Sequence, residues 1–171
     1  AQSTGEDTMG KLTACLPEDF NSDGSVDYVV WPYKGLSGIG GGVRWKGANN
    51  GIYESEGTIV INGGNIRAKG QDRASAIGGT FQDHADVASS GYSSEKRLGG
   101  SITINGGIVR TEAITSGTAI TAFNVGIGSC CSGYGGSVTI NGGTVIANAA
   151  SSAISTGRDG SITINGGTIT A

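Results

Sequence analysis

The sequence is poor in several residue types, and each shortage excludes a class of protein. Only 15% of the 171 residues are charged, the 11 Lys and Arg are scattered and the net charge is −3, so we expect no nucleic-acid partner, which would need clustered basic residues. No run approaches the roughly 20 apolar residues of a membrane span. Only two prolines occur and the glycines follow no three-residue period, which excludes collagen.

Cysteine is also scarce, and its three copies predict the compartment. Cys130 and Cys131 are adjacent in a Gly/Ser-rich stretch, which suits a disulfide better than a metal site or a catalytic thiol. We expect Cys15 to pair with Cys130 or with Cys131. The odd count then leaves one thiol free or bonded to another subunit, unless the adjacent pair closes on itself. The start of the chain fits a secreted or cell-surface protein whose leader has been removed.

Glycine, by contrast, is abundant with 33 residues, and a repeated phrase accounts for it. Four copies of a phrase ending Ile-Asn-Gly-Gly lie at 57–64, 100–107, 136–143 and 160–167. A second alternating run follows each copy. A third short element follows at 75–78, 118–121 and 152–155, with an earlier relative at 37–40. The first glycine of a copy lies 20, 20 and 18 residues before the isoleucine of the third element (77−57, 120−100, 154−136). Because this distance is nearly constant, we expect insertions only between the third element and the next copy of the phrase.

This arrangement favours a solenoid over hairpins. Asn-Gly between alternating runs normally signals a hairpin, but a hairpin would not require a third strand at near-constant spacing. Repeats with three short strands predict a parallel β-helix, in which Ile and Val point inward and Ser and Thr outward. The amides of the repeated asparagines can donate and accept along one corner, and the glycines supply positive φ there. The predicted ladder consists of Asn62, Asn105, Asn141 and Asn165.

The repeated phrase resembles the Gly-rich right-handed parallel β-helix repeats of bacterial secreted and cell-surface proteins. The resemblance covers residues 36–171 and implies an all-β fold with three short strands per coil, so residues 1–35 are predicted to form an N-terminal cap. It further implies an extracellular protein of a group that is variously adhesive, carbohydrate-binding or structural. It carries no catalytic residue onto this chain.

One motif in the predicted cap suggests calcium, the one cofactor that we expect. It resembles the Asp-rich loops of dockerins and EF-hands. Oxygen ligands stand at alternate positions, which suits the six to eight oxygens that calcium takes. The ligands would be the side chains of Asp19, Asn21, Asp23 and Asp27 with the Ser25 carbonyl. Val30 occupies the position of the usual bidentate glutamate, and an Asx-rich turn is the alternative.

Aromatic residues lie outside the two repeated strand runs and offer a glycan site. Six are expected on the variable side of the coils: Trp45, Tyr53, Phe81, Tyr92, Phe123 and Tyr134. Insertions on one face of a repeat protein often form its binding face, and exposed rings can stack on sugars. The alternative is a small satellite core built from these rings.

No pattern predicts an enzyme. Outward repeat positions are mainly Ser, Thr and Asn, without a column of paired carboxylates, a Ser-His-Asp order or a phosphate loop. The cluster Asp83-His84-Ala85-Asp86 is expected to be a solvated loop, since no second histidine or cysteine pair has ligand spacing. Ice binding is also disfavoured, because Val60 interrupts the Ser-x-Thr columns.

The end of the repeat array favours self-association. Only one further strand follows the phrase at 160–167, and an uncovered coil presents unpaired strand edges. Either the chain is a piece of a longer protein, or a neighbouring subunit covers that end. We therefore expect a structural or adhesive solenoid that associates through its ends, in the form of head-to-tail filaments. A carbohydrate-binding module is the alternative, and a polysaccharide lyase or hydrolase is less favoured.

Overall fold

The described part of the chain is built from β-strands alone. The computed structural model describes residues 10–14, 37–40, 57–71, 74–79, 98–114, 124–129, 134–157 and 159–171. Thirteen strands in these ranges form three sheets, and every strand pair within them is parallel. The same ranges hold no helix long and apolar enough to cross a membrane.

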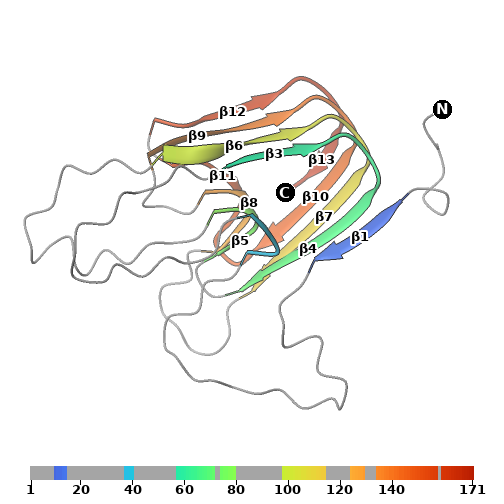
Figure 1. Cartoon of the computed structure of the whole chain (residues 1–171), viewed down its shortest axis with the longest axis horizontal. Helices are drawn as coiled ribbons and strands as arrows, with labels where there is room; N and C mark the ends of the chain where they lie inside the picture. The colour runs from blue at the N-terminus through green and yellow to red at the C-terminus, as the bar shows by residue number, and fades with distance from the viewer. Residues whose placement is uncertain are drawn as a thin grey trace, which may run out of the picture.

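The strands follow one another from sheet to sheet in a fixed order. Sheet C contains β3 (Thr58–Ile61), β6 (Leu98–Ile104), β9 (Tyr134–Ile140) and β12 (Ser161–Ile164). Sheet A contains β1 (Lys11–Ala14), β4 (Asn65–Gln71), β7 (Ile108–Ile114), β10 (Thr144–Ala149) and β13 (Thr168–Thr170). Sheet B contains β2 (Ile39–Gly40), β5 (Ser75–Gly78), β8 (Val125–Gly128) and β11 (Ser152–Ser155). Figure 1 shows the three sheets as walls around one interior. The fold is therefore a parallel β-helix, as the sequence predicts.

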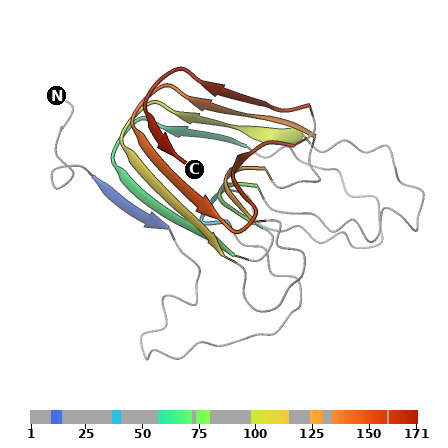
Figure 2. The ribbon, with the colours of Figure 1, turned by 180° about the vertical axis from the view of Figure 1, so that it is seen from behind.

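Each complete coil takes one strand from each sheet and pairs with the coils before and after it. In sheet C, for example, Ile61, Ile104, Ile140 and Ile164 share one column. Such stacking places identical positions of the repeat above one another, which is why the sequence repeats. Figure 2 shows the coils from behind, with the coil of β12 and β13 in front.

The apolar side chains that alternate along the strands fill the interior. Ile104, Ile127 and Ile140 are fully buried at 0% exposure, and Val109 and Val145 are equally buried in sheet A. Since every middle coil contributes such residues from all three sheets, the stack shares one continuous core.

The sequence prediction is wrong for the third strand of the second full coil. We expected residues 118–121 there, but β8 occupies that place, with Ile127 aligned to Ile77 of β5 and Ile154 of β11. The connection from β7 to β8 therefore spans 115–123. The insertions are thus divided between two corners of the coil, and the expectation of a single variable side is wrong.

A further strand precedes the repeated phrases. β1 lies within the segment predicted as the N-terminal cap, and it pairs with β4 at the edge of sheet A. Its Leu12 continues the inward column of Ile66, Val109 and Val145. Sheet A therefore begins one coil earlier than the first Asn-Gly-Gly.

The Asn-Gly-Gly corner turns the chain from sheet C into sheet A. The second glycine has a positive φ in each copy, +96° at Gly64, +90° at Gly107 and at Gly143, and +101° at Gly167. A Cβ at Gly107 would lie 2.5 Å from the carbonyl oxygen of Gly64 in the coil below. Glycine is required here both by the dihedral angle and by the close approach of the stacked backbones.

Candidate functional site

The asparagines of this corner form a hydrogen-bonded ladder. Asn105 Nδ2 donates to Asn62 Oδ1 at 2.8 Å, Asn141 Nδ2 to Asn105 Oδ1 at 2.7 Å, and Asn165 Nδ2 to Asn141 Oδ1 at 2.8 Å. All three of these donor amides point toward the preceding coil, so the ladder has a direction. Its role is structural, because it ties coil to coil along an exposed edge.

The coil formed by β12 and β13, called here the β12–β13 coil, exposes side chains that belong to the interior. Ile162 is 46% exposed and Ile164 is 55% exposed. The equivalent Val138 and Ile140, one coil earlier, are 1% and 0% exposed. No described strand pairs with the far side of β12 or β13. The coil is thus an apolar surface bordered by two strand edges.

The opposite end of the solenoid also presents part of its interior. Leu12 lies at an inward position of β1 and is 49% exposed. At this end the outermost described strands belong to sheets A and B, whereas at the β12–β13 coil they belong to sheets A and C. The two ends therefore differ in which wall stops first.

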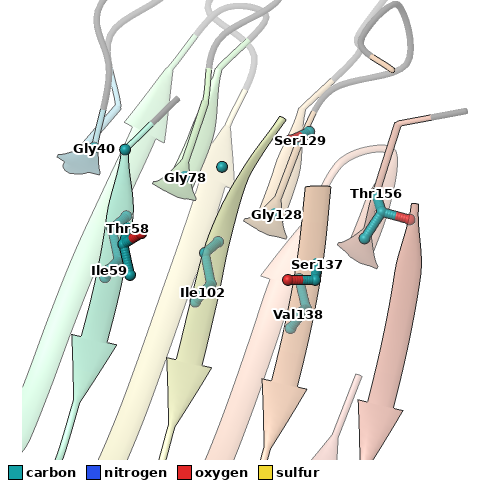
Figure 3. Close-up of a pocket in the computed structure, with 12 residues that line it drawn as sticks. Gly40, Thr58, Ile59, Gly78, Ile102, Gly128, Ser129, Ser137, Val138 and Thr156 are labelled. Atoms are coloured by element: carbon teal, nitrogen blue, oxygen red, sulfur yellow. The ribbon is translucent and has the colours of Figure 1, made fainter. Parts of the chain in front are cut away.

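A pocket of about 340 Å³ lies where sheet B meets sheet C. Figure 3 shows its wall: the ends of the sheet B strands, with Gly40, Gly78 and Gly128, face the first inward residues of sheet C, Ile59, Ile102 and Val138. Thr58, Ser129, Ser137 and Thr156 also belong to its lining. Its size is within the range of ligand pockets, and no charged residue belongs to its described lining.

The sheet B wall of this pocket requires glycine at one position of each strand that lines it. Gly40, Gly78 and Gly128 align in register and have φ of +134°, +129° and +121°. A Cβ on any of them would collide with backbone of the next coil. The recurring Ile-Gly pair at these positions is the sequence signal that locates the pocket, and it was not used in the prediction.

The predicted glycan-binding aromatics divide between two corners by their positions in the chain. Trp45 and Tyr53 fall between β2 and β3, and Phe81 and Tyr92 between β5 and β6, so these segments begin and end beside the pocket. Phe123 falls between β7 and β8, which join at a different corner. The expectation that all six share one side is therefore wrong for Phe123. These five residues lie outside the described residues.

Tyr134, the sixth aromatic, begins β9, where its backbone pairs with Leu98 of β6. The remaining predicted sites are not within the described ranges. They are the calcium ligands Asp19, Asn21, Asp23, Ser25 and Asp27, the cluster Asp83, His84 and Asp86, and the cysteines Cys15, Cys130 and Cys131. Calcium binding and the disulfide therefore stay predictions. Within the described part, no group of three or more His, Cys, Asp and Glu could hold a metal ion.

The outer faces of sheets A and C differ in charge. Sheet A stacks Arg67 on Arg110 and Lys69 beside Glu112, and Arg110 Nη1 donates to Asn65 Oδ1 at 3.1 Å. The outward columns of sheet C from β3 to β12 contain Thr, Ser, Val and no charge. In one of these columns the Ser101 hydroxyl donates to Thr58 Oγ1 at 3.1 Å.

Comparison with known proteins adds no identification. No protein-family model, no curated protein and no solved structure matches the chain. The coil stack, the pocket and the exposed coil end are therefore the features from which a function can be inferred.

Proposed function

We propose that this chain is a non-enzymatic, extracellular structural or adhesive β-solenoid of the bacterial surface type, and that it associates with further copies through its coil ends. The observation that carries the proposal is the exposure of Ile162 and Ile164, 46% and 55%, at positions that are buried in the coil before. An exposed apolar patch with adjacent unpaired strand edges favours pairing with another chain.

The magnitude of this effect predicts weak, concentration-dependent association. Full burial of an isoleucine is worth about 1.5–3 kcal/mol, so covering the exposed half of each side chain contributes roughly 1 kcal/mol. Association costs at least about 4 kcal/mol in lost translational and rotational freedom. The two isoleucines of the β12–β13 coil are therefore insufficient alone, and backbone hydrogen bonds along the strand edges must add to them. Head-to-tail filaments and closed dimers are the two forms that such pairing can take.

Sedimentation velocity across protein concentration tests the proposal, with electron microscopy of the concentrated sample. The variant Ile164→Lys places a charge on the coil end and should abolish association, because the ammonium would lose its water on pairing. Thr163→Lys is the matched control: it lies next in β12 on the outward face and should associate like the native chain. Native protein that stays monomeric up to about 1 mM, a range chosen to detect weak complexes, would refute the proposal.

The pocket supports a second candidate, a carbohydrate-binding module. Its described lining is uncharged, and the segments that carry Trp45, Tyr53, Phe81 and Tyr92 start and finish at its rim. Neutral sugars bind in such sites by stacking and by hydrogen bonds to hydroxyl groups. A glycan array should detect binding that Trp45→Ala abolishes. Phe123→Ala should have no effect, because residue 123 joins the coil at another corner.

A further inference from the structure

Asparagine is followed by glycine at each described corner between sheet C and sheet A, and this dipeptide is chemically reactive. When the backbone N–H of the glycine loses its proton to a base, the nitrogen can attack the carboxamide carbon of the asparagine. The new C–N bond closes a succinimide ring as the bond to the side-chain nitrogen breaks and ammonia leaves. Water then opens the ring and yields aspartate or isoaspartate. Glycine favours the attack because it has no Cβ in the way.

The copies of this corner have the same local sequence but different surroundings in space. Each reads Ile-Asn-Gly-Gly, with a strand of sheet C before it and a strand of sheet A after it. The intrinsic reactivity of the dipeptide is therefore the same in every copy. Any difference in reaction rate between the copies must come from the contacts that the fold makes around them.

The ladder holds the carboxamide of Asn62 at one atom only. Asn62 Oδ1 accepts from Asn105 Nδ2 at 2.8 Å, and Asn62 Nδ2 donates to no residue in the described part of the chain. Asn105 is held at both atoms, since its Oδ1 also accepts from Asn141 Nδ2 at 2.7 Å, and Asn141 is held in the same way. Attack requires the carboxamide to rotate toward the glycine nitrogen. Asn105 must therefore break one more hydrogen bond than Asn62 before it can react.

The glycine after Asn62 is also the least covered of the corner glycines. A Cβ at Gly63 would meet no atom within 4 Å, whereas at Gly106 it would lie 3.4 Å from Asn62 O, and at Gly142 3.2 Å from Asn105 O. Gly63 is exposed, while Gly106 and Gly142 are half-buried. Ring closure moves this peptide unit and needs a base and water beside it. Both requirements are met more easily at Gly63.

The direction of the ladder makes position 62 tolerant of the aspartate product. Asn62 takes part only as an acceptor, and a carboxylate accepts the same bond from Asn105 more strongly because it is charged. Asn105 must donate to Asn62 Oδ1, which a carboxylate cannot do, so aspartate there would set two acceptor oxygens against each other. Asn165 donates to Asn141 and would lose its bond in the same way. Isoaspartate lengthens the backbone by one carbon and would disturb any of these corners.

We propose that Asn62-Gly63 is a self-modification site of this solenoid, at which the folded chain deamidates faster than at Asn105 or Asn141. The aspartate product places a negative charge on the exposed edge of the ladder without breaking it. The additional hydrogen bond at Asn105 should slow its reaction at least about fivefold relative to Asn62, which equals about 1 kcal/mol of activation free energy. The site does not depend on the proposed self-association.

Ageing of the full chain at mildly alkaline pH, followed by tryptic digestion and tandem mass spectrometry, measures the rates. Deamidation raises the mass of a peptide by about one dalton. Asn62 and Asn105 fall in tryptic peptides that end at Arg67 and Arg110, and fragmentation must resolve Asn62 from Asn50, which also precedes glycine. In the folded chain Asn62 should react at least about fivefold faster than Asn105. In urea the two rates should be nearly equal, because only the shared Ile-Asn-Gly-Gly sequence remains.

Three variants test the two parts of the proposal. Alanine fits at position 63, where φ is not positive and no atom lies within 4 Å of a Cβ, so Gly63→Ala should slow the reaction at Asn62 sharply and leave Asn105 unchanged. Asn62→Asp should unfold at the same urea concentration as the native chain or a higher one, and Asn105→Asp at a lower one. Equal rates at Asn62 and Asn105 in the folded chain would overturn the proposal. So would a loss of stability in Asn62→Asp as large as that in Asn105→Asp.

Discussion

Alanine at the second glycine of a corner should destabilise the solenoid far more than alanine at the first. Gly107 has φ +90°, and a Cβ there would lie 2.5 Å from Gly64 O and 2.7 Å from the carbonyl carbon of Gly63. Strain of a non-glycine residue at such an angle costs about 1–3 kcal/mol, and forcing extra volume against rigid backbone costs about 1–3 kcal/mol more. We expect Gly107→Ala to lower the free energy of unfolding by roughly 2–6 kcal/mol, the sum of these two effects.

Its neighbour provides the control. Gly106 does not have a positive φ, and a Cβ there would be 3.4 Å from Asn62 O, an ordinary contact. Gly106→Ala should therefore change stability by less than about 1 kcal/mol, since alanine also reduces the freedom of the unfolded chain. Urea unfolding followed by far-UV circular dichroism compares both variants with the native chain. Equal losses for the two, or a loss below about 0.5 kcal/mol for Gly107→Ala, would refute the stacked-backbone reasoning.

Two further predictions concern the ladder and the core. Asn105 makes two ladder bonds and Asn165 makes one, so Asn105→Ala should cost about 1–2 kcal/mol in urea unfolding and Asn165→Ala about half of that; equal costs would contradict the ladder. The Thr111 hydroxyl is buried without a hydrogen-bond partner, while the neighbouring column positions are Ala68 and Ala147. Thr111→Val should therefore raise stability by about 1 kcal/mol, and Thr111→Ser should not; a loss in the valine variant would show that the hydroxyl is satisfied.

The sequence predicts sheets A and C well because one phrase encodes both. Its alternating residues define the inward side, and its Asn-Gly-Gly defines the turn between them. Ile102, Ile104 and Ile140 are buried as expected, at 4%, 0% and 0% exposure. Repetition supplies the register as well, since identical positions must stack for the corner glycines to fit.

Sheet B is less predictable because its strands are short and contain few specific residues. Residues 118–121 and 125–128 both present an isoleucine beside small residues, and spacing alone favoured the wrong one. The glycine after the isoleucine distinguishes them physically. Gly128 has φ +121° and no room for a Cβ, whereas Ile120 is followed by threonine. Close backbone approach, rather than distance along the chain, therefore identifies the third strand wherever another described strand stacks on it; β11, on which none stacks, has Ser155 at this position.

The features of the candidate site also differ in how well the sequence predicts them. Features encoded in the repeat, such as the asparagine ladder, could be read from the sequence because each coil confirms the next. The sequence also indicates an uncovered coil at 160–171, but the extent to which Ile162 and Ile164 are exposed needed the structure, because these residues are chemically the same as the buried Ile102 and Ile104. A repeat sequence specifies how one coil covers another, so the same residue types that are buried in the middle coils are exposed in the outermost described coil. The proposed self-association would therefore use the same kind of contact between copies that packs one coil on the next within the chain.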